Sequence, residues 1–149
     1  MKLGFASDHR GYELKEYLKN YYKDLYEIVD YGTNSLESVD YPDYAFKLGK
    51  AVISKEVDFG IAICGSGIGI SIACNKVKGV RCAKVSNEEE AMYTREDNDS
   101  NIVAFGEKTS KEDAIKIINK FVETKFSNLE KHQRRINKIT SYEEGTYEG

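Results

Sequence analysis

The chain has 149 residues, of which 40% are hydrophobic and 32% charged, with 12 glycines and one proline. This length suits one domain with a single core, and the composition excludes fibrous and disordered classes. We expect one domain over residues 1–149, with a frayed tail at about 142–149. The net charge of −3 disfavours a general nucleic-acid-binding surface.

No segment has the features of a membrane span or a secretion signal. The longest apolar run, residues 59–74, is broken by glycines and is shorter than the ~20 residues that a bilayer requires. The first residues become polar at Ser7, so a signal peptide is not expected. Three cysteines, an odd number, indicate free thiols and not a disulfide framework. We therefore expect a cytoplasmic protein with no membrane partner.

Short segments that favour β-structure alternate with segments of helical period, which predicts a parallel sheet with helices on both faces. The expected strands lie near 2–7, 26–31, 58–64, 80–85 and 101–105. Apolar residues recur at helical spacing after the first, second and fifth strands: Leu14, Tyr17, Leu18 and Tyr21; Tyr44, Leu48, Ala51 and Val52; Ala114, Ile117, Ile118, Phe121 and Val122. Each set is predicted to face the core.

Capping pairs and a basic segment mark the later helices. Ser86 with Glu89 and Ser110 with Asp113 each place a hydroxyl three residues before a carboxylate, a pattern typical of helix starts. A last helix is predicted near 129–141. Its apolar face carries Leu129, His132, Ile136 and Ile139, and its other face carries Lys131, Arg135 and Lys138. Lys131 and Arg135 are four residues apart on one helical face, where two cations can bind one phosphate, although a solvated basic face is the commoner explanation for such a pattern.

The segment Cys64-Gly-Ser-Gly-Ile-Gly69 carries the clearest chemical signal. It follows the third strand, and ligands of open α/β sheets bind at the carboxyl ends of strands. Alternate glycines leave backbone N–H groups free to hold an anion, and the start of the next helix favours negative charge there. A thiol beside these donors is expected to ionise readily and to act as a base or nucleophile. The glycine spacing does not fit a dinucleotide or Walker motif.

Each of these residues also has a structural interpretation. A cysteine at a strand end is commonly a small buried hydrophobic residue, and Asp8 can be a helix N-cap. A lone histidine is more often structural than catalytic. His9 nevertheless follows the first strand, where a cleft would lie.

Taken together, these segments resemble the ribose-5-phosphate isomerase B family over almost the whole chain. The matching stretches are Ser7–Gly11, Val29–Thr33, Asp40–Pro42, Ile63–Ala73, Asn75–Val77, Asn98–Asn101, Ala104–Gly106 and His132–Arg135. The resemblance implies a three-layer α/β/α Rossmann-like sandwich with a five-stranded parallel sheet of order 2-1-3-5-4. It also implies a homodimer or tetramer whose C-terminal helix reaches the partner subunit, so that sites are shared.

The family interconverts D-ribose 5-phosphate and D-ribulose 5-phosphate, a step of the pentose phosphate pathway, without metal or cofactor. The resemblance implies that Cys64 is the base and that the Ser66 hydroxyl and nearby amides hold a cis-enediolate. Asp8 and His9 would contact sugar hydroxyls or the partner's phosphate. The remaining substrate-binding positions implied are Tyr41, Gly65, Gly67, Ile68, Gly69, Asn98, Lys108, Lys131 and Arg135.

Three positions depart from the family pattern. Asp97 stands where many members have a histidine that opens the furanose ring, and Lys108 and Lys131 stand where arginine is usual. Lysine keeps the charge but loses the bidentate fork. Asp97 would need a raised pKa to act as an acid at neutral pH; otherwise His9 or solvent opens the ring.

Two alternative functions remain beside that of a ribose-5-phosphate isomerase. A galactose-6-phosphate or allose-6-phosphate isomerase would use the same scaffold, and Cys64 with the Asn98–Asp99 pair favours the pentose enzyme. A non-catalytic phosphosugar-binding protein is the alternative from another class. A binding protein needs the phosphate clamp but not the thiol, so Cys64 and Ser66 argue against it.

Overall fold

The computed structural model describes residues 1–149 and contains a five-stranded sheet of order β2-β1-β3-β5-β4. All neighbouring strands pair in parallel, as expected. The strands are β1 (Lys2–Ser7), β2 (Glu27–Asp30), β3 (Phe59–Cys64), β4 (Cys82–Lys84) and β5 (Ile102–Gly106). This sheet order confirms the order implied by the family resemblance.

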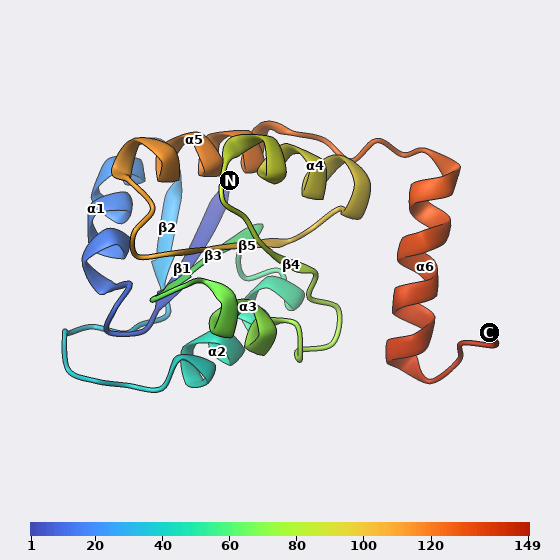
Figure 1. The fold of residues 1–149 in the computed structure, drawn as a ribbon, viewed down its shortest axis with the longest axis horizontal. Helices are drawn as coiled ribbons and strands as arrows, with labels where there is room; N and C mark the ends of the chain where they lie inside the picture. Colours follow the sequence, from blue (N-terminus) through green and yellow to red (C-terminus); the bar gives the residue numbers. More distant parts are fainter.

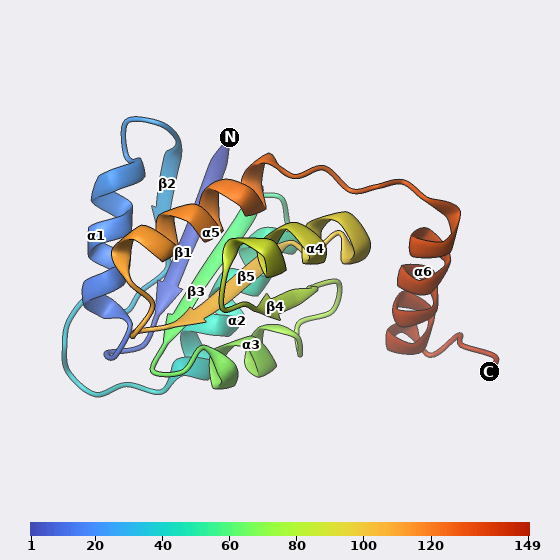
Figure 2. The same ribbon diagram turned by 45° about the horizontal axis from the view of Figure 1, so that its top comes forward.

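Six helices accompany the sheet: α1 (Tyr12–Tyr22), α2 (Tyr41–Ile53), α3 (Ile68–Cys74), α4 (Glu88–Asn98), α5 (Lys111–Glu123) and α6 (Glu130–Glu144). Figure 1 shows α1, α4 and α5 on one face of the sheet and α2 and α3 on the other. Two apolar clusters fill the two layers between helices and sheet. None of these helices combines the length and the hydropathy that a membrane-spanning helix needs. In Figures 1 and 2, α6 stands apart from this layered body.

Alternation along β3 decides which side chains enter which layer. Ile61 and Ile63 belong to the cluster under α1 and α5, whereas Ala62 and Cys64 belong to the cluster under α2 and α3. A Cβ at Gly60 would lie 3.0 Å from a Leu48 side-chain atom, so the small residue allows α2 to pack closely on the sheet. The strand therefore delivers Cys64 to the α2–α3 side of its carboxyl end.

The buried face of α1 differs from the predicted one. Tyr17 and Tyr21 are exposed, while Lys15 and Tyr22 are fully buried with Leu14 and Leu18. Both sets fit a helical period, so spacing alone does not choose between them. Two polar partners decide the choice: Lys15 Nζ donates to Asp30 Oδ2 (2.7 Å), and the Tyr22 hydroxyl donates to Asn119 Oδ1 (2.7 Å).

One of the predicted helix ends agrees with the structure, and two differ from it. The Ser110 hydroxyl accepts from Asp113 N–H (3.1 Å), as predicted. The cap of α4 lies one residue later than expected, because the Asn87 side chain accepts from Glu90 N–H (2.9 Å). Helix α6 continues to Glu144 and ends at Gly145, whose φ is 79°, so it runs three residues beyond the expected limit of 141.

Candidate active site

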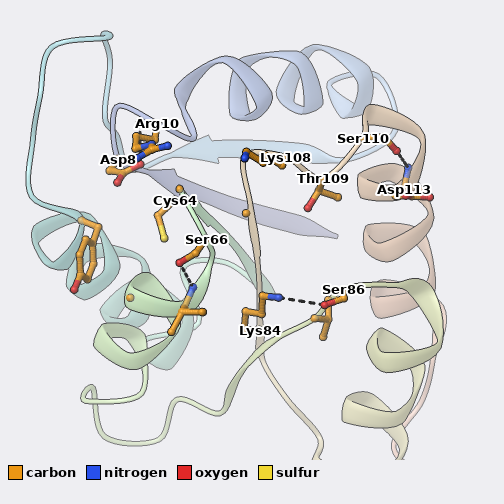
Figure 3. A pocket seen from close by; sticks show the side chains of 16 residues that line it. Asp8, Arg10, Cys64, Ser66, Lys84, Ser86, Lys108, Thr109, Ser110 and Asp113 are labelled. Atoms are coloured by element: carbon orange, nitrogen blue, oxygen red, sulfur yellow. Dashed lines mark hydrogen bonds between the residues drawn. The ribbon is translucent and has the colours of Figure 1, made fainter.

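A cleft of about 1000 Å³ lies at the carboxyl edge of the sheet (Figure 3). The turn after β3 contributes the Cys64 segment, and the segments after β1, β4 and β5 together with the start of α2 form the other walls. The sequence-predicted site residues that line it are Asp8, Tyr41, Cys64, Gly65, Ser66, Ile68, Gly69 and Lys108. The lining residues to which the sequence assigned no part in the site are Arg10, Lys84, Val85, Ser86, Gly106, Thr109, Ser110 and Asp113; three of these, Ser86, Ser110 and Asp113, were predicted only as capping residues.

The turn between β3 and α3 folds backbone amides around the cysteine. Gly67 N–H donates to Cys64 Sγ at 3.2 Å, and Ile68 N–H donates to Ser66 Oγ at 3.1 Å. Gly67 has a φ of 80°, and a Cβ there would lie 2.6 Å from the carbonyl carbon of Phe105 in β5. Only glycine fits this position without moving the backbone. The glycine at 67 is therefore what allows the amide to face the sulfur.

Asp8 stabilises the turn between β1 and α1 and lines the cleft. Its Oδ1 accepts from Arg10 N–H (3.0 Å) and Gly11 N–H (3.1 Å), and the residue is 5% exposed. A Cβ on Gly11 would lie 2.5 Å from the Ile63 carbonyl oxygen, so the start of α1 sits directly against the end of β3. The N-cap of α1 is Gly11 and has no side-chain cap hydrogen bond, so the N-cap interpretation of Asp8 is wrong: Asp8 orders the turn that precedes the helix and lines the cleft.

Tyr41 and His9 are held by different contacts. A Cβ on Gly69 would lie 2.7 Å from Tyr41 Cζ, so the Tyr41 ring packs against the glycine turn. His9 is not among the residues that line the cleft. Its Nδ1 accepts from Val39 N–H (3.2 Å), which ties the segment before α2 to the end of β1.

Four other predicted site residues lie away from this cleft. Asp97 and Asn98 end α4, before β5 begins, so they lie at the amino edge of the parallel sheet. The length of β3, roughly 20 Å at about 3.3 Å per residue, separates that edge from Cys64. Lys131 and Arg135 are exposed on α6. His132 joins these two regions, because its Nε2 lies 3.5 Å from Asp97 Oδ1.

An ion pair at the cleft was not foreseen from the sequence. Arg10 Nε donates to Glu107 Oε2 at 2.7 Å, across 97 residues of chain. The hydrogen bond and the charge of Glu107 raise the pKa of the Arg10 guanidinium above its ordinary value. In the sequence, the position of Arg10 in the Ser7–Gly11 stretch, next to Asp8 and His9, was the signal that could have marked it as a site residue. Its ion-pair partner Glu107 could not be predicted, because the two residues meet only in the folded chain.

No group of three or more His, Cys, Asp or Glu side chains is arranged to hold a metal ion. The polar groups that face the cleft are instead amides, hydroxyls, one thiol and charged side chains of both signs. This set can bind an anionic, hydroxylated molecule and exchange a proton with it.

Comparison with known proteins agrees with this geometry. Residues 3–139 match the family model described as Ribose/Galactose Isomerase. Ribose-5-phosphate isomerase B of Escherichia coli is 39% identical, with 96% of this chain and 97% of that protein covered. The structure of ribose-5-phosphate isomerase B from Clostridium thermocellum superposes with a TM-score of 0.94 at 44% identity, covering 97% of this chain and 99% of that one.

A second solved structure carries a ligand. Ribose-5-phosphate isomerase B from Mycoplasma genitalium, with bound ribulose-5-phosphate, has a TM-score of 0.89 at 36% identity and covers 96% of both chains. Matches of this identity and coverage over one shared fold are evidence of common descent. With its glycine turn, its sheet order and these relatives, the chain belongs to the ribose/galactose isomerase family.

Proposed function

We propose that this protein is an aldose-ketose isomerase that interconverts D-ribose 5-phosphate and D-ribulose 5-phosphate through a cis-enediolate. The observation that carries the proposal is the position of Cys64 Sγ, which faces the cleft and lies 3.2 Å from the Gly67 amide nitrogen. Relatives with this fold bear the name ribose-5-phosphate isomerase B, and one is solved with ribulose-5-phosphate.

In the proposed mechanism, the Cys64 thiolate removes the proton from C2 of the open-chain aldose and returns it to C1. The negative charge that develops on the enediolate oxygens needs donors that are already in place. Among the turn amides from Gly65 to Gly69, those of Gly67 and Ile68 donate to Cys64 Sγ and Ser66 Oγ, which leaves those of Gly65, Ser66 and Gly69 as the proposed donors to the enediolate. Ser66 Oγ accepts from Ile68 N–H, which leaves its own hydroxyl proton free to donate to the substrate.

We propose that the phosphate is bound by Lys108 from one subunit and by Lys131 and Arg135 from the partner in a homodimer, with a tetramer as a larger assembly. Lys108 lines the cleft, whereas the other two lie on α6. Only Ile136 of α6 is buried, while Leu129 and Ile139 are 50% and 57% exposed. An amphipathic helix with so little of its apolar face covered favours docking on a second copy.

Asp97 and Asn98 would reach the substrate in the same way, from the partner subunit. In that arrangement Asp97 is the proposed ring-opening group, with His132 against it. Initial rates from ribose 5-phosphate and from ribulose 5-phosphate test this role, because the open-chain ketose needs no ring opening. His9 is the alternative ring-opening group.

The test is an assay of purified protein with ribose 5-phosphate, in which ribulose 5-phosphate is followed. Cys64→Ala should lower turnover at least about a hundredfold with little change in substrate binding. Cys82→Ala is the control, because Cys82 is a free thiol that does not line the cleft. An alanine variant within tenfold of the wild type would remove Cys64 as the base. Galactose 6-phosphate and allose 6-phosphate serve as comparison substrates, and binding without turnover would indicate the non-catalytic alternative.

A further inference from the structure

The mechanism above assigns no role to Arg10, although its side chain lies beside the reactive turn. A Cβ built on Gly65 would lie 3.2 Å from Arg10 Nε and 3.4 Å from Arg10 Cζ. The guanidinium therefore covers the residue that follows Cys64, and Figure 3 shows Arg10 and Asp8 at the same end of the cleft as Cys64. The Arg10 side chain is 58% exposed, so this position requires a tether.

The fold supplies a tether at both ends. The backbone N–H of Arg10 donates to Asp8 Oδ1 (3.0 Å), which fixes the start of the side chain. Glu107 N–H donates to the Cys64 carbonyl oxygen (2.9 Å), and the Glu107 carboxylate accepts from Arg10 Nε (2.7 Å). The carboxylate that holds Arg10 is thus anchored on the backbone of Cys64 itself. The two Nη groups of Arg10 donate no hydrogen bond within the chain, so they are free to act on charge in the cleft.

We propose that Arg10, held in place by Glu107, stabilises the thiolate of Cys64 and so sets the pH at which this residue becomes reactive. The inference deepens the proposed function, in which Cys64 is the base, and makes Arg10 a positioning residue that acts through Cys64. A fixed cation beside a thiolate favours the charged form.

Other groups face Cys64 across the cleft and contribute to its field. Asp8 and the Glu107 carboxylate oppose ionisation, and Lys84 and Lys108 favour it; Asp113 and Tyr41 complete the titratable lining. Arg10 is distinguished from the two lysines by its contact with Gly65 and by its anchored partner.

The test measures the rate at which iodoacetamide alkylates Cys64 over a range of pH, read from the Cys64 peptide by mass spectrometry so that the other two thiols do not interfere. Arg10→Gln should raise the pH midpoint by about half a unit, which is about a threefold slower reaction below the midpoint; the moderate size reflects solvent screening. Arg10→Lys keeps the charge and should retain part of the effect. Lys2→Gln is the matched control: it removes one positive charge of similar exposure (55%) at the amino end of β1, and no shift is expected.

The role of Glu107 is tested by repeating Arg10→Gln in a Glu107→Gln background. Without the tether the guanidinium leaves Gly65, so the shift caused by Arg10→Gln should be smaller there. An equal shift in both backgrounds would overturn the tether. An unchanged midpoint in Arg10→Gln would overturn the proposal, and a raised KM in that variant would then identify Arg10 as a substrate contact. Alkylation does not depend on isomerase activity, so a failure of the proposed function would be seen separately in the assay with ribose 5-phosphate.

Discussion

The buried lysine of α1 offers a quantitative test of what holds the first βαβ unit together. Lys15 is fully buried, and its Nζ contacts Asp30 Oδ2 at 2.7 Å and Glu16 Oε2 at 3.1 Å. Asp30 also accepts from Gly32 N–H through its other oxygen (2.8 Å). Burial acts to raise the pKa of Asp30, but the hydrogen bonds from Lys15, Lys19 and Gly32 outweigh it, so the pKa lies below its ordinary value.

Asp30→Asn keeps the shape of the side chain and removes its charge. Leaving a buried charge without its partner costs about 3–5 kcal/mol, and the remaining Glu16, which is 40% exposed, should reduce this to about 2–3 kcal/mol. For a chain of this size, each kcal/mol lowers the melting temperature by about 2–4 °C, which predicts a fall of roughly 4–12 °C. Lys19→Met is the matched control. Lys19 contacts the same two carboxylates but is 26% exposed, so its loss should cost less than about 1 kcal/mol.

Denaturant unfolding at several pH values measures the loss of stability in Asp30→Asn and shows whether that loss comes from the charge of Asp30. Because the folded pKa of Asp30 is lowered, its ion pairs contribute fully above the unfolded value of about 3.9, and the contribution is lost as the pH falls through the folded pKa. The difference in free energy of unfolding between wild type and Asp30→Asn should therefore be constant from about pH 7 to 5 and shrink below about pH 4. Lys15→Met combined with Asp30→Asn should recover much of the loss. A loss of stability in Asp30→Asn no larger than that in Lys19→Met, or a loss that does not change in acid, would refute the assignment of this stability to the ion pair with Lys15.

Two further predictions concern the site. Gly67→Ala should lower turnover more than about tenfold and reduce the melting temperature, because its Cβ would meet the Phe105 backbone at 2.6 Å. The control is Gly145→Ala, where φ is a similar 79° and no atom lies within 4 Å, so the change should cost only about 1 kcal/mol of stability and leave activity unchanged. Equal losses of activity in the two variants would contradict the steric argument. Mixing inactive Cys64→Ala and Arg135→Ala subunits should restore about a quarter of wild-type activity, since random pairing makes half of the dimers mixed with one intact site each. If subunit exchange is demonstrated by mass spectrometry and no activity returns, the sites are not shared.

Features that depend on residues close together in the chain could be predicted from the sequence. Alternating β-favouring and helical segments placed all five strands, because side-chain period and backbone preference are local properties. The glycine run after Cys64 predicted an amide-lined turn, and the Ser110 cap was read correctly, since both depend on residues within three positions. The resemblance to a family supplied the sheet order, which no local pattern contains.

Contacts between residues far apart in the chain could not be predicted and are known from the folded structure. It placed Lys15 in the interior because Asp30 of β2 lies opposite, and it joined Arg10 to Glu107 across 97 residues of chain. It also put Asp97 and Asn98 at the amino edge of the sheet, away from Cys64 of the same chain, whereas the family resemblance had assigned all three to substrate sites without saying which subunit supplies each. Hydrogen bonds and charges act over a few ångströms of space, whatever the separation along the chain, so their partners are fixed by the packing of strands and helices and not by spacing in the sequence.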